Sequence, residues 1–398
     1  MFGFGKKRVY LDYASATPVL PEASTAVGEA EKTFGNPGSI HTEGVTAKRK
    51  LEQARESIAK ELACKARELV FVSSGTEANN LAIVGFAKKL ERIRRTLEGT
   101  HWIVFAMEHP SVLECFVEVE RLGGEVTHLA PDGNGIVHLQ SVEQALRPET
   151  IFISIGWANH EIGVVQKIAD ISRVIRASEE RNKREIMFHC DAGQAPLYRA
   201  PRVHTLGVDM LSLDSGKLYG PRGIAALYLS HRVALAPVIL GGSQERGLRA
   251  GTENVALAIG FEAAITAIAL KRDRESHRLR KLRDDLAQKI VEIIPEAVIN
   301  GDLRHALPHI LNISIPHIDS EYIALALDKE GIAIATKSAC REGEESQSHV
   351  VAALGGDEWR KENSLRFSLG RDTREKDLRV AVKALQQVSN TKHRTKNT

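Results

Sequence analysis

The chain has 398 residues, of which 43% are apolar and 26% are charged. This length exceeds that of a minimal binding module and predicts two or three domains, while the ordinary composition excludes disordered, collagenous and membrane classes. Lys and Arg total 54 against 51 Asp and Glu, and the last ten residues hold three of these cations and no acid. The neutral remainder lacks the broad positive field that non-specific nucleic-acid binding requires, although a local basic stripe stays open.

Four cysteines are spread along the chain without a C-x-x-C pair or the spacing of a zinc site. So few thiols predict a reducing compartment. The N-terminus has basic residues but no following apolar run of signal-peptide length. No stretch approaches the roughly 18 apolar residues of a spanning helix. We therefore expect a cytoplasmic protein with no membrane association and no metal site.

Short apolar, β-rich runs alternate with helical patterns through the first part of the chain. This alternation predicts an α/β domain with a largely parallel sheet. Most of the runs are too apolar for a strand with one wet face, so we expect helices on both faces of the sheet. The seven candidate strands are residues 69–72, 103–106, 126–130, 151–155, 186–190, 210–213 and 225–229.

A second pattern follows in the C-terminal part. Residues 255–294 are helical in pattern, first Ala-rich and then charged with both signs, which predicts a long connecting helix with a solvated face. Beyond it we expect a smaller α+β domain with strands at 310–315, 332–336 and 365–369 and helices near 320–330 and 374–387. The expected organisation is an N-terminal arm (1–20) that contributes to the small domain, a large domain (21–258), the small domain (259–388) and a disordered basic tail (389–398).

The first motif with chemical content is SSGTE at 73–77, between a predicted strand and a helical run. Ser74 and Glu77 have capping-box spacing, so a helix is expected to begin here, with Gly75 and Thr76 presenting unpaired N–H groups. These donors and the helix dipole suit a phosphate. An ordinary helix cap is the alternative, and it is favoured when this motif is considered alone.

Asp191 follows directly on an apolar run, and Lys217 lies in the turn after another such run. An acid at the carboxyl end of a strand could hold a cation or a protonated ring nitrogen, and a lysine at the rim of a sheet can serve as a Schiff-base amine. Considered alone, such an Asp is more often an ordinary turn residue, and such a Lys is more often exposed to solvent. In the order anion-binding turn, Asp, then Lys, the three features are typical of a pyridoxal-phosphate site.

At this point the sequence resembles the cysteine desulfurases of the NifS and IscS type, in the class V aminotransferase family. The resemblance covers nearly the whole chain and implies a fold-type I large domain with a mainly parallel seven-stranded sheet and a smaller α+β C-terminal domain. The matching stretches are YLDYASATPV (10–19), FGNPGSIH (34–41), SGTEANNLAI (74–83), EHPSV (108–112), NHEIGVVQ (159–166), HCDAGQA (189–195), KLYGPRG (217–223), GLRAGTENV (247–255), SAC (338–340) and SLRFSLGR (364–371).

The resemblance implies roles for residues around the cofactor ring of pyridoxal 5′-phosphate. Lys217 would hold the cofactor as a Schiff base, Asp191 would pair with the pyridine nitrogen, and His109 would stack on the ring and shuttle protons. Gln194 would bond the phenolic oxygen of the ring. Asn159 would lie beside it, near the substrate.

It also implies roles at the phosphate and the substrate. Gly75 and Thr76 would bind the phosphate, and Thr252 would reach the phosphate of the partner subunit in a homodimer. Arg366 would clamp the substrate carboxylate in a bidentate pair, a duty that suits a planar fork. Asn36 would contribute to the substrate site.

Cys340 matches the sulfur acceptor of the family. Its polar, Gly-containing setting, ATKSACREGEE, is typical of an exposed loop. Lys337 and Arg341 would favour the thiolate, while the glutamates of REGEE would oppose it. The spacing to SHV (348–350) resembles the long-loop subgroup, in which the thiol travels to an external acceptor. The remaining cysteines, Cys64, Cys115 and Cys190, fit buried and inert thiols.

One departure from the family pattern affects the phosphate site. Family members commonly carry Ser-x-His-Lys at the Schiff-base lysine, and here the segment reads DSGK (214–217). Two phosphate ligands are therefore replaced. Asp214 would repel the phosphate unless it turns away or pairs with Arg222 or Arg249. Ser215 could bind the phosphate after a small backbone shift.

The implied activity is conversion of L-cysteine to L-alanine with transfer of sulfur to Cys340 as a persulfide, for delivery to a protein acceptor such as an iron–sulfur scaffold. One alternative is another class V reaction, such as selenocysteine lysis or desulfinase-like elimination. A second is a cofactor-poor relative acting as a scaffold, which Asp214 and Gly216 would favour. A dinucleotide-binding oxidoreductase is disfavoured because no G-x-G-x-x-G follows a strand.

Overall fold

The computed structural model describes residues 8–336 and 347–395. Its centre is a seven-stranded sheet in the order β2-β8-β7-β6-β5-β3-β4. Strand β8 runs antiparallel to both of its neighbours, and the other pairs are parallel. The strands are β2 (Leu69–Val72), β3 (His101–Phe105), β4 (Glu125–Leu129), β5 (Thr150–Ser154), β6 (Met187–Asp191), β7 (Met210–Asp214) and β8 (Ala225–Leu229). Each of the seven expected strands is present, and the α/β fold class is confirmed.

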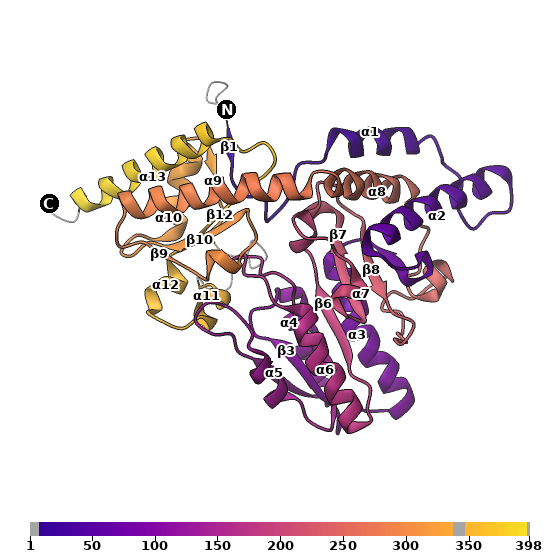
Figure 1. Ribbon diagram of the computed structural model, residues 1–398. Helices are drawn as coiled ribbons and strands as arrows, with labels where there is room; N and C mark the ends of the chain where they lie inside the picture. Colours follow the sequence, from indigo (N-terminus) through magenta and orange to yellow (C-terminus); the bar gives the residue numbers. More distant parts are fainter. Residues whose placement is uncertain (1–7, 337–346, 396–398) are drawn as a thin grey trace.

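Helices cover both faces of this sheet (Figure 1). Alternate residues of β2 show why, since Leu69 and Phe71 belong to one buried apolar cluster and Val70 and Val72 to another. Successive side chains of a strand point to opposite faces, so a run that is apolar at every position needs cover on both sides. One face packs against α3 (Gly75–Arg94) and α4 (Pro110–Arg121), and the other against α2 (Thr42–Leu62), α6 (Ile168–Asn182), α7 (Val203–Leu206) and α8 (Val255–Ala269).

The C-terminal part contains a three-stranded antiparallel sheet in the order β12-β10-β9 and a two-stranded parallel sheet, β1-β11. Strand β1 comes from the N-terminal arm, and Asp12 extends its contact by bridging to Ser368. The expected strand at 332–336 is shorter than predicted, with Ala335 forming only an isolated bridge to Arg366. The strands are β1 (Val9–Tyr10), β9 (Val298–Ile299), β10 (Ile310–Ser314), β11 (Ile332–Ala333) and β12 (Ser364–Ser368).

The predicted connecting helix is two helices, α8 and α9 (Arg272–Ile293). Helix α8 packs against α1 (Pro21–Ala30) and α2, whereas α9 packs against α13 (Glu375–Thr395) and β10. The break falls where an apolar stretch gives way to a charged, amphipathic one. We therefore place the division between the two parts of the chain at Leu270, inside the range first assigned to the small domain.

The C-terminal helix corrects a further expectation. Residues 389–395 were expected to be disordered, but the backbone of α13 is helical through Thr395. This stretch has no Gly or Pro to stop a helix. The other helices are α5 (Leu139–Ala145), α10 (Ser320–Lys329), α11 (His349–Ala353) and α12 (Glu358–Glu362).

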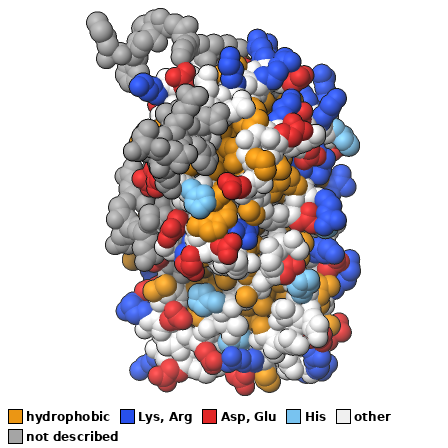
Figure 2. Space-filling model, turned by 90° about the vertical axis from the view of Figure 1, so that its left-hand side faces the viewer, with side chains coloured by type: hydrophobic (Ala, Val, Ile, Leu, Met, Phe, Trp, Pro, Cys, Tyr) orange, Lys and Arg blue, Asp and Glu red, His pale blue; other side chains and the backbone are white. Residues whose placement is uncertain are grey.

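Charges of both signs are interspersed over the face shown in Figure 2, around a band of hydrophobic side chains. Along α9 the charges pair within the helix, as Arg278 does with Glu275 and Lys289 with Asp285. Over the described ranges, no helix is long and apolar enough to cross a membrane.

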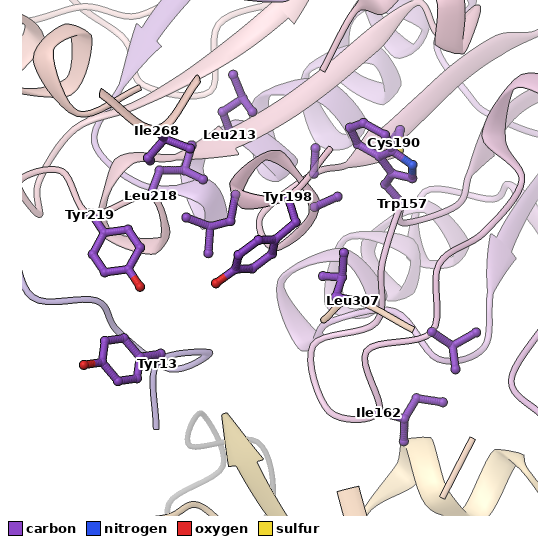
Figure 3. Close-up of a cluster of buried hydrophobic side chains, with 14 of the residues drawn as sticks. Tyr13, Trp157, Ile162, Cys190, Tyr198, Leu213, Leu218, Tyr219, Ile268 and Leu307 are labelled. Carbon is purple, nitrogen blue, oxygen red and sulfur yellow. The ribbon is translucent and has the colours of Figure 1, made fainter. Parts of the chain in front are cut away.

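A buried aromatic cluster fixes the N-terminal arm against the large sheet. Figure 3 shows Tyr198 and Tyr219 with their hydroxyl ends directed toward each other, and Tyr13 below Tyr219. The ring centroids of Tyr13 and Tyr219 are 6.2 Å apart. Gly370 is required here, because a Cβ at this position would lie 2.1 Å from the Tyr13 ring. The cluster therefore sets the path of the residues that follow Tyr13.

A buried ion pair ties α2 to the loop before α8. Arg55 and Glu245 form two hydrogen bonds of 2.6 and 2.8 Å, and their side chains are 5% and 1% exposed. Glu245 also accepts a hydrogen bond from the Phe71 backbone, and the Arg55 guanidinium lies 4.6 Å from the Phe71 ring centroid. Both partners of the pair are therefore fully satisfied by protein groups.

We expect Glu245→Ala to lower the free energy of unfolding by about 3–5 kcal/mol, because it removes the buried partner of the Arg55 guanidinium and leaves it only the exposed Glu52 carboxylate. Urea unfolding followed by circular dichroism measures the change. The control is Glu118→Ala, which removes the exposed Arg121 pair in α4 and should move the midpoint little. Equal shifts for the two variants would contradict the importance given to the buried pair.

Candidate active site

A cavity of about 280 Å³ lies at the carboxyl ends of β3, β6 and β7, beside the N-terminus of α3. In open α/β sheets ligands gather at this edge. The N-terminal arm contributes Ala14 and Ser15 to its wall, and β12 contributes Arg366. The predicted site residues that line it are Gly75, Thr76, His109, Asn159, Asp191, Gln194, Lys217 and Arg366.

Other predicted site residues do not line this cavity. Ser215 is fully buried, and its hydroxyl lies where it would meet a Cβ on Gly220, so it faces the protein interior. Thr252 is exposed in the loop before α8, and the resemblance assigns it to the partner's site. Asn36 is exposed between α1 and α2, and its side chain accepts a hydrogen bond from Gly38. Cys340 lies outside the described residues.

Lys217 stands in the short turn after β7, and its amine is held by the N-terminal arm. Its Nζ donates hydrogen bonds to the Ala14 and Ser15 carbonyls at 2.9 and 2.7 Å. Gln194 Nε2 donates to the same Ala14 carbonyl at 2.8 Å. Two convergent carbonyl oxygens suit an ammonium group, so the arm positions the amine inside the cavity.

Asp191 ends β6, and both of its carboxylate oxygens accept hydrogen bonds. Oδ1 accepts from the Gly193 backbone at 2.8 Å, and Oδ2 accepts from Asn79 Nδ2 at 2.8 Å. Asn79 is 1% exposed and lies one turn after Gly75 in α3. A carboxylate fixed in this way can face a protonated ring nitrogen without rotating.

His109 caps the N-terminus of α4, where its ring accepts a hydrogen bond from the Ser111 backbone. Its ring centroid is 5.1 Å from that of His160. Burial lowers the pKa of His109, with Lys217 and His349 adding to the effect and Asp191 opposing it. The neutral imidazole is therefore the favoured form at this position.

Glu108 lines the same cavity, and the sequence analysis gave it no role. Burial raises the pKa of this carboxyl to about 8; a hydrogen bond from the Gly156 backbone opposes the shift and the Asp191 charge adds to it. His349 contacts the Glu108 carbonyl at 3.0 Å and so ties α11 to this wall. A carboxyl group that stays neutral next to the fixed Asp191 charge can donate a hydrogen bond.

The Arg366 guanidinium is 3% exposed and is held by three protein groups. Nη2 donates to Asp12 and Ser15 at 2.9 and 2.6 Å, and Nη1 donates to the His160 carbonyl at 2.8 Å. Nε is buried with no partner among the described residues. A substrate carboxylate can therefore form the expected bidentate pair only by exchanging one of these contacts.

The predicted anion site at the start of α3 holds a carboxylate. Ser74 caps the helix as expected, accepting a hydrogen bond from Glu77. Asp214 Oδ2 lies 3.4 Å from the Gly75 nitrogen, while Oδ1 accepts from Gly216 at 2.9 Å. Arg249, one of the cations expected to neutralise Asp214, pairs with Glu77 instead. The acid therefore occupies the position that an anion would take.

Sequence reasoning missed Asn79, Glu108, Ser111 and His160, which all line the cavity. All four lie inside stretches that carry the family resemblance. Asn79 also carried an independent signal, because it is four residues after Gly75 and therefore on the same helix face. No local pattern identifies the others, since their roles depend on contacts between separate elements.

Comparison with known proteins assigns the chain to a family. The aminotransferase class-V family profile matches residues 9–380. Cysteine desulfurase IscS of Dictyoglomus turgidum is 39% identical over 384 residues, which cover 96% of this chain and 95% of that protein. Among solved structures, a NifS-like protein has a TM-score of 0.89 at 29% identity, covering 97% of this chain and 100% of the other. A structure described as SspA in complex with cysteine has a TM-score of 0.75 at 33% identity, covering 91% and 99%.

The chain belongs to the class V aminotransferase family. Enzymes of this family use pyridoxal 5′-phosphate, so this chain is a PLP-dependent enzyme. These side chains fit the ring of that cofactor, since the Lys217 amine, the Asp191 carboxylate and the Gln194 amide line one cavity. At the phosphate end, the N-terminus of α3 fits an anion but already faces Asp214.

We expect Asp214→Asn to increase the affinity for pyridoxal 5′-phosphate by about tenfold, because it removes a negative charge next to the phosphate site while keeping the side-chain shape. Equilibrium dialysis followed by fluorescence of the released cofactor measures the dissociation constant. Asp273→Asn, at an exposed position of α9, is the matched control. An unchanged constant would mean that Asp214 turns away when the cofactor binds.

Proposed function

We propose that this chain is a cysteine desulfurase, which converts L-cysteine to L-alanine and transfers sulfur to Cys340 as a persulfide. The observation that carries the proposal is the meeting of Lys217, Asp191, His109 and Arg366 around one cavity. Relatives named cysteine desulfurase IscS and a similar structure described in complex with cysteine support the choice of substrate.

The bound cofactor supplies an electron sink for the charge left on the substrate α-carbon when its proton is removed. Asp191 supports this role, since a fixed carboxylate stabilises the protonated pyridine nitrogen. Gln194 would orient the ring through its amide, which donates a hydrogen bond to the Ala14 carbonyl. His109, at the start of α4, would stack on the ring.

Lys217 has two duties in this proposal. It holds the cofactor, and its free amine accepts the proton of the substrate α-carbon. The carbonyls of Ala14 and Ser15 give the resulting ammonium two acceptors within reach. The arm thus stabilises the lysine in its protonated state after it has acted as a base.

Arg366 orients the substrate by its carboxylate. Its present partners are Asp12, Ser15 and the His160 carbonyl, and the Ser15 hydroxyl is the neutral side chain among them. Exchange of this hydroxyl for the substrate carboxylate keeps the buried cation paired at every stage. A positioned carboxylate then fixes where the substrate sulfur points.

The sulfur transfer step involves Cys340. Its thiolate forms a bond with the substrate sulfur, and the bond between that sulfur and the substrate β-carbon breaks, leaving its electron pair with the carbon. The β-carbon then gains a proton, and the α-carbon regains the proton held by Lys217, which gives L-alanine. The persulfide is then passed to a protein acceptor, for which an iron–sulfur scaffold is the proposed class. A reducing compartment such as the cytoplasm keeps the thiol available between cycles.

A homodimer completes the proposed site. Thr252 and Asn36 lie outside the cavity of their own chain, in exposed loops, so they serve the cavity of a second copy. Phe34 and Ile40, which flank Asn36, are 83% and 97% exposed. Large apolar side chains at such exposure favour burial in an interface.

We expect Cys340→Ala to bind pyridoxal 5′-phosphate normally and to lose persulfide formation, because only the sulfur acceptor is removed. Mass spectrometry of the protein after cysteine addition detects the persulfide, and sulfide and alanine assays follow turnover. Cys64→Ala, which changes a half-buried thiol packed against the core, is the control and should behave as the unchanged protein.

The outcomes separate the alternatives. Unchanged sulfide release by Cys340→Ala would remove the role given to this thiol. Turnover of selenocysteine but not cysteine would favour a selenocysteine lyase on the same site. If the unchanged protein fails to bind the cofactor, the result would favour the alternative of a cofactor-poor scaffold protein, which Asp214 suggests.

A further inference from the structure

A chain of hydrogen bonds joins Asp191 to His109 through two residues to which neither the motifs nor the proposed reaction gives a role. Asn79 Nδ2 contacts Asp191 Oδ2 at 2.8 Å and Ser111 Oγ at 2.9 Å. Ser111 Oγ contacts His109 Nδ1 at 2.8 Å. The chain thus connects the residue expected at the ring nitrogen with the residue expected on the ring face.

The direction of each hydrogen bond follows from what the groups can donate. The Asn79 amide nitrogen has two hydrogens and no lone pair to offer, so Asp191 and Ser111 both accept from it. The opposite amide orientation would place an oxygen against the Asp191 carboxylate. The single hydroxyl hydrogen of Ser111 is then directed to His109 Nδ1.

His109 Nδ1 receives a second donor as well. The Ser111 backbone N–H lies 3.1 Å from it, as the cap of α4. A nitrogen that accepts hydrogen bonds carries no proton, so the neutral ring holds its proton on Nε2. The N-terminal dipole of α4 further disfavours a positive charge on this ring.

We propose that Ser111 and Asn79 are positioning residues that hold His109 neutral with its proton on Nε2, so that it acts as a hydrogen-bond donor in the desulfuration reaction. This inference rests on the proposed function for its catalytic meaning and on the hydrogen bonds alone for its structural content. Lys217 and His109 then have separate roles in the reaction. Lys217 removes the α-proton, and His109 donates from Nε2 to negative charge that develops beside the ring.

The structural content is tested by nitrogen NMR of the holoenzyme labelled with 15N-histidine, with His109→Gln used to assign the signal. We expect the Nε2–H tautomer near neutral pH. Ser111→Ala should raise the pKa of His109, because a hydrogen bond that favoured the neutral ring is lost. Ser111→Thr keeps the hydroxyl and should restore the original titration.

Ser178→Ala is the matched control. Ser178 is a fully buried serine of α6 whose hydroxyl also accepts from an asparagine amide, that of Asn182 at 3.2 Å. It lies outside the cavity lining, so the His109 titration should not move. A change in Ser178→Ala equal to that in Ser111→Ala would show a general loss of structure and would overturn the proposal.

The catalytic meaning is tested by steady-state alanine formation. Ser111→Ala should lower kcat about tenfold with little change in KM, since one oriented hydrogen bond is lost and substrate contacts remain. Asn79→Ala and Ser111→Ala should be non-additive, because both break the same chain. Additive effects, or an Nδ1–H tautomer in the unchanged protein, would overturn the proposal. Absence of alanine formation by the unchanged protein would instead refute the proposed function and leave the NMR result standing.

Discussion

The site depends on the hydrogen bonds that the N-terminal arm makes at residues 12–15. Lys217 and Gln194 share the Ala14 carbonyl, and Arg366 donates to Asp12 and Ser15. The arm is in turn fixed from both sides, since β1 pairs with β11 and the Tyr13 ring packs among the aromatic side chains next to the large sheet. Neither sheet forms the site alone. The two parts of the chain must be joined before the amine and the guanidinium are aligned.

The cavity separates fixed charges from groups that burial keeps neutral. Lys217, Asp191 and Arg366 have hydrogen-bond partners that match their charge. Glu108 and His109 face the same space, but desolvation raises the pKa of the acid and lowers that of the base. In such a buried site the ionised side chains are already paired. The neutral donors therefore remain able to stabilise negative charge that develops during the reaction.

Local patterns were enough to predict the large sheet and the start of α3. Every expected strand of that sheet was found because each is an apolar run bounded by polar turns, and Ser74 was found because an N-cap is a local device. Local pattern also singled out the SSGTE turn, Asp191 and Lys217, whereas the other site residues came from the family resemblance. Eight of the expected site residues line one cavity, including all of those expected around the ring.

The errors arose where distant contacts outweigh local pattern. The break between α8 and α9 follows from α8 packing on α1 and α2, which the helical pattern alone does not reveal. Ser215 turns inward because Gly220, which has no side chain, leaves room for the Ser215 hydroxyl.

The surroundings of Asp214 also depend on contacts between distant parts of the chain. The sequence showed an acid among phosphate ligands, but only the fold shows that it meets Gly75 and that Arg249 is committed to Glu77. With Arg249 engaged by Glu77, the acid competes with any anion for the same helix terminus, so we expect retention of the cofactor to depend on the residues assigned to its ring.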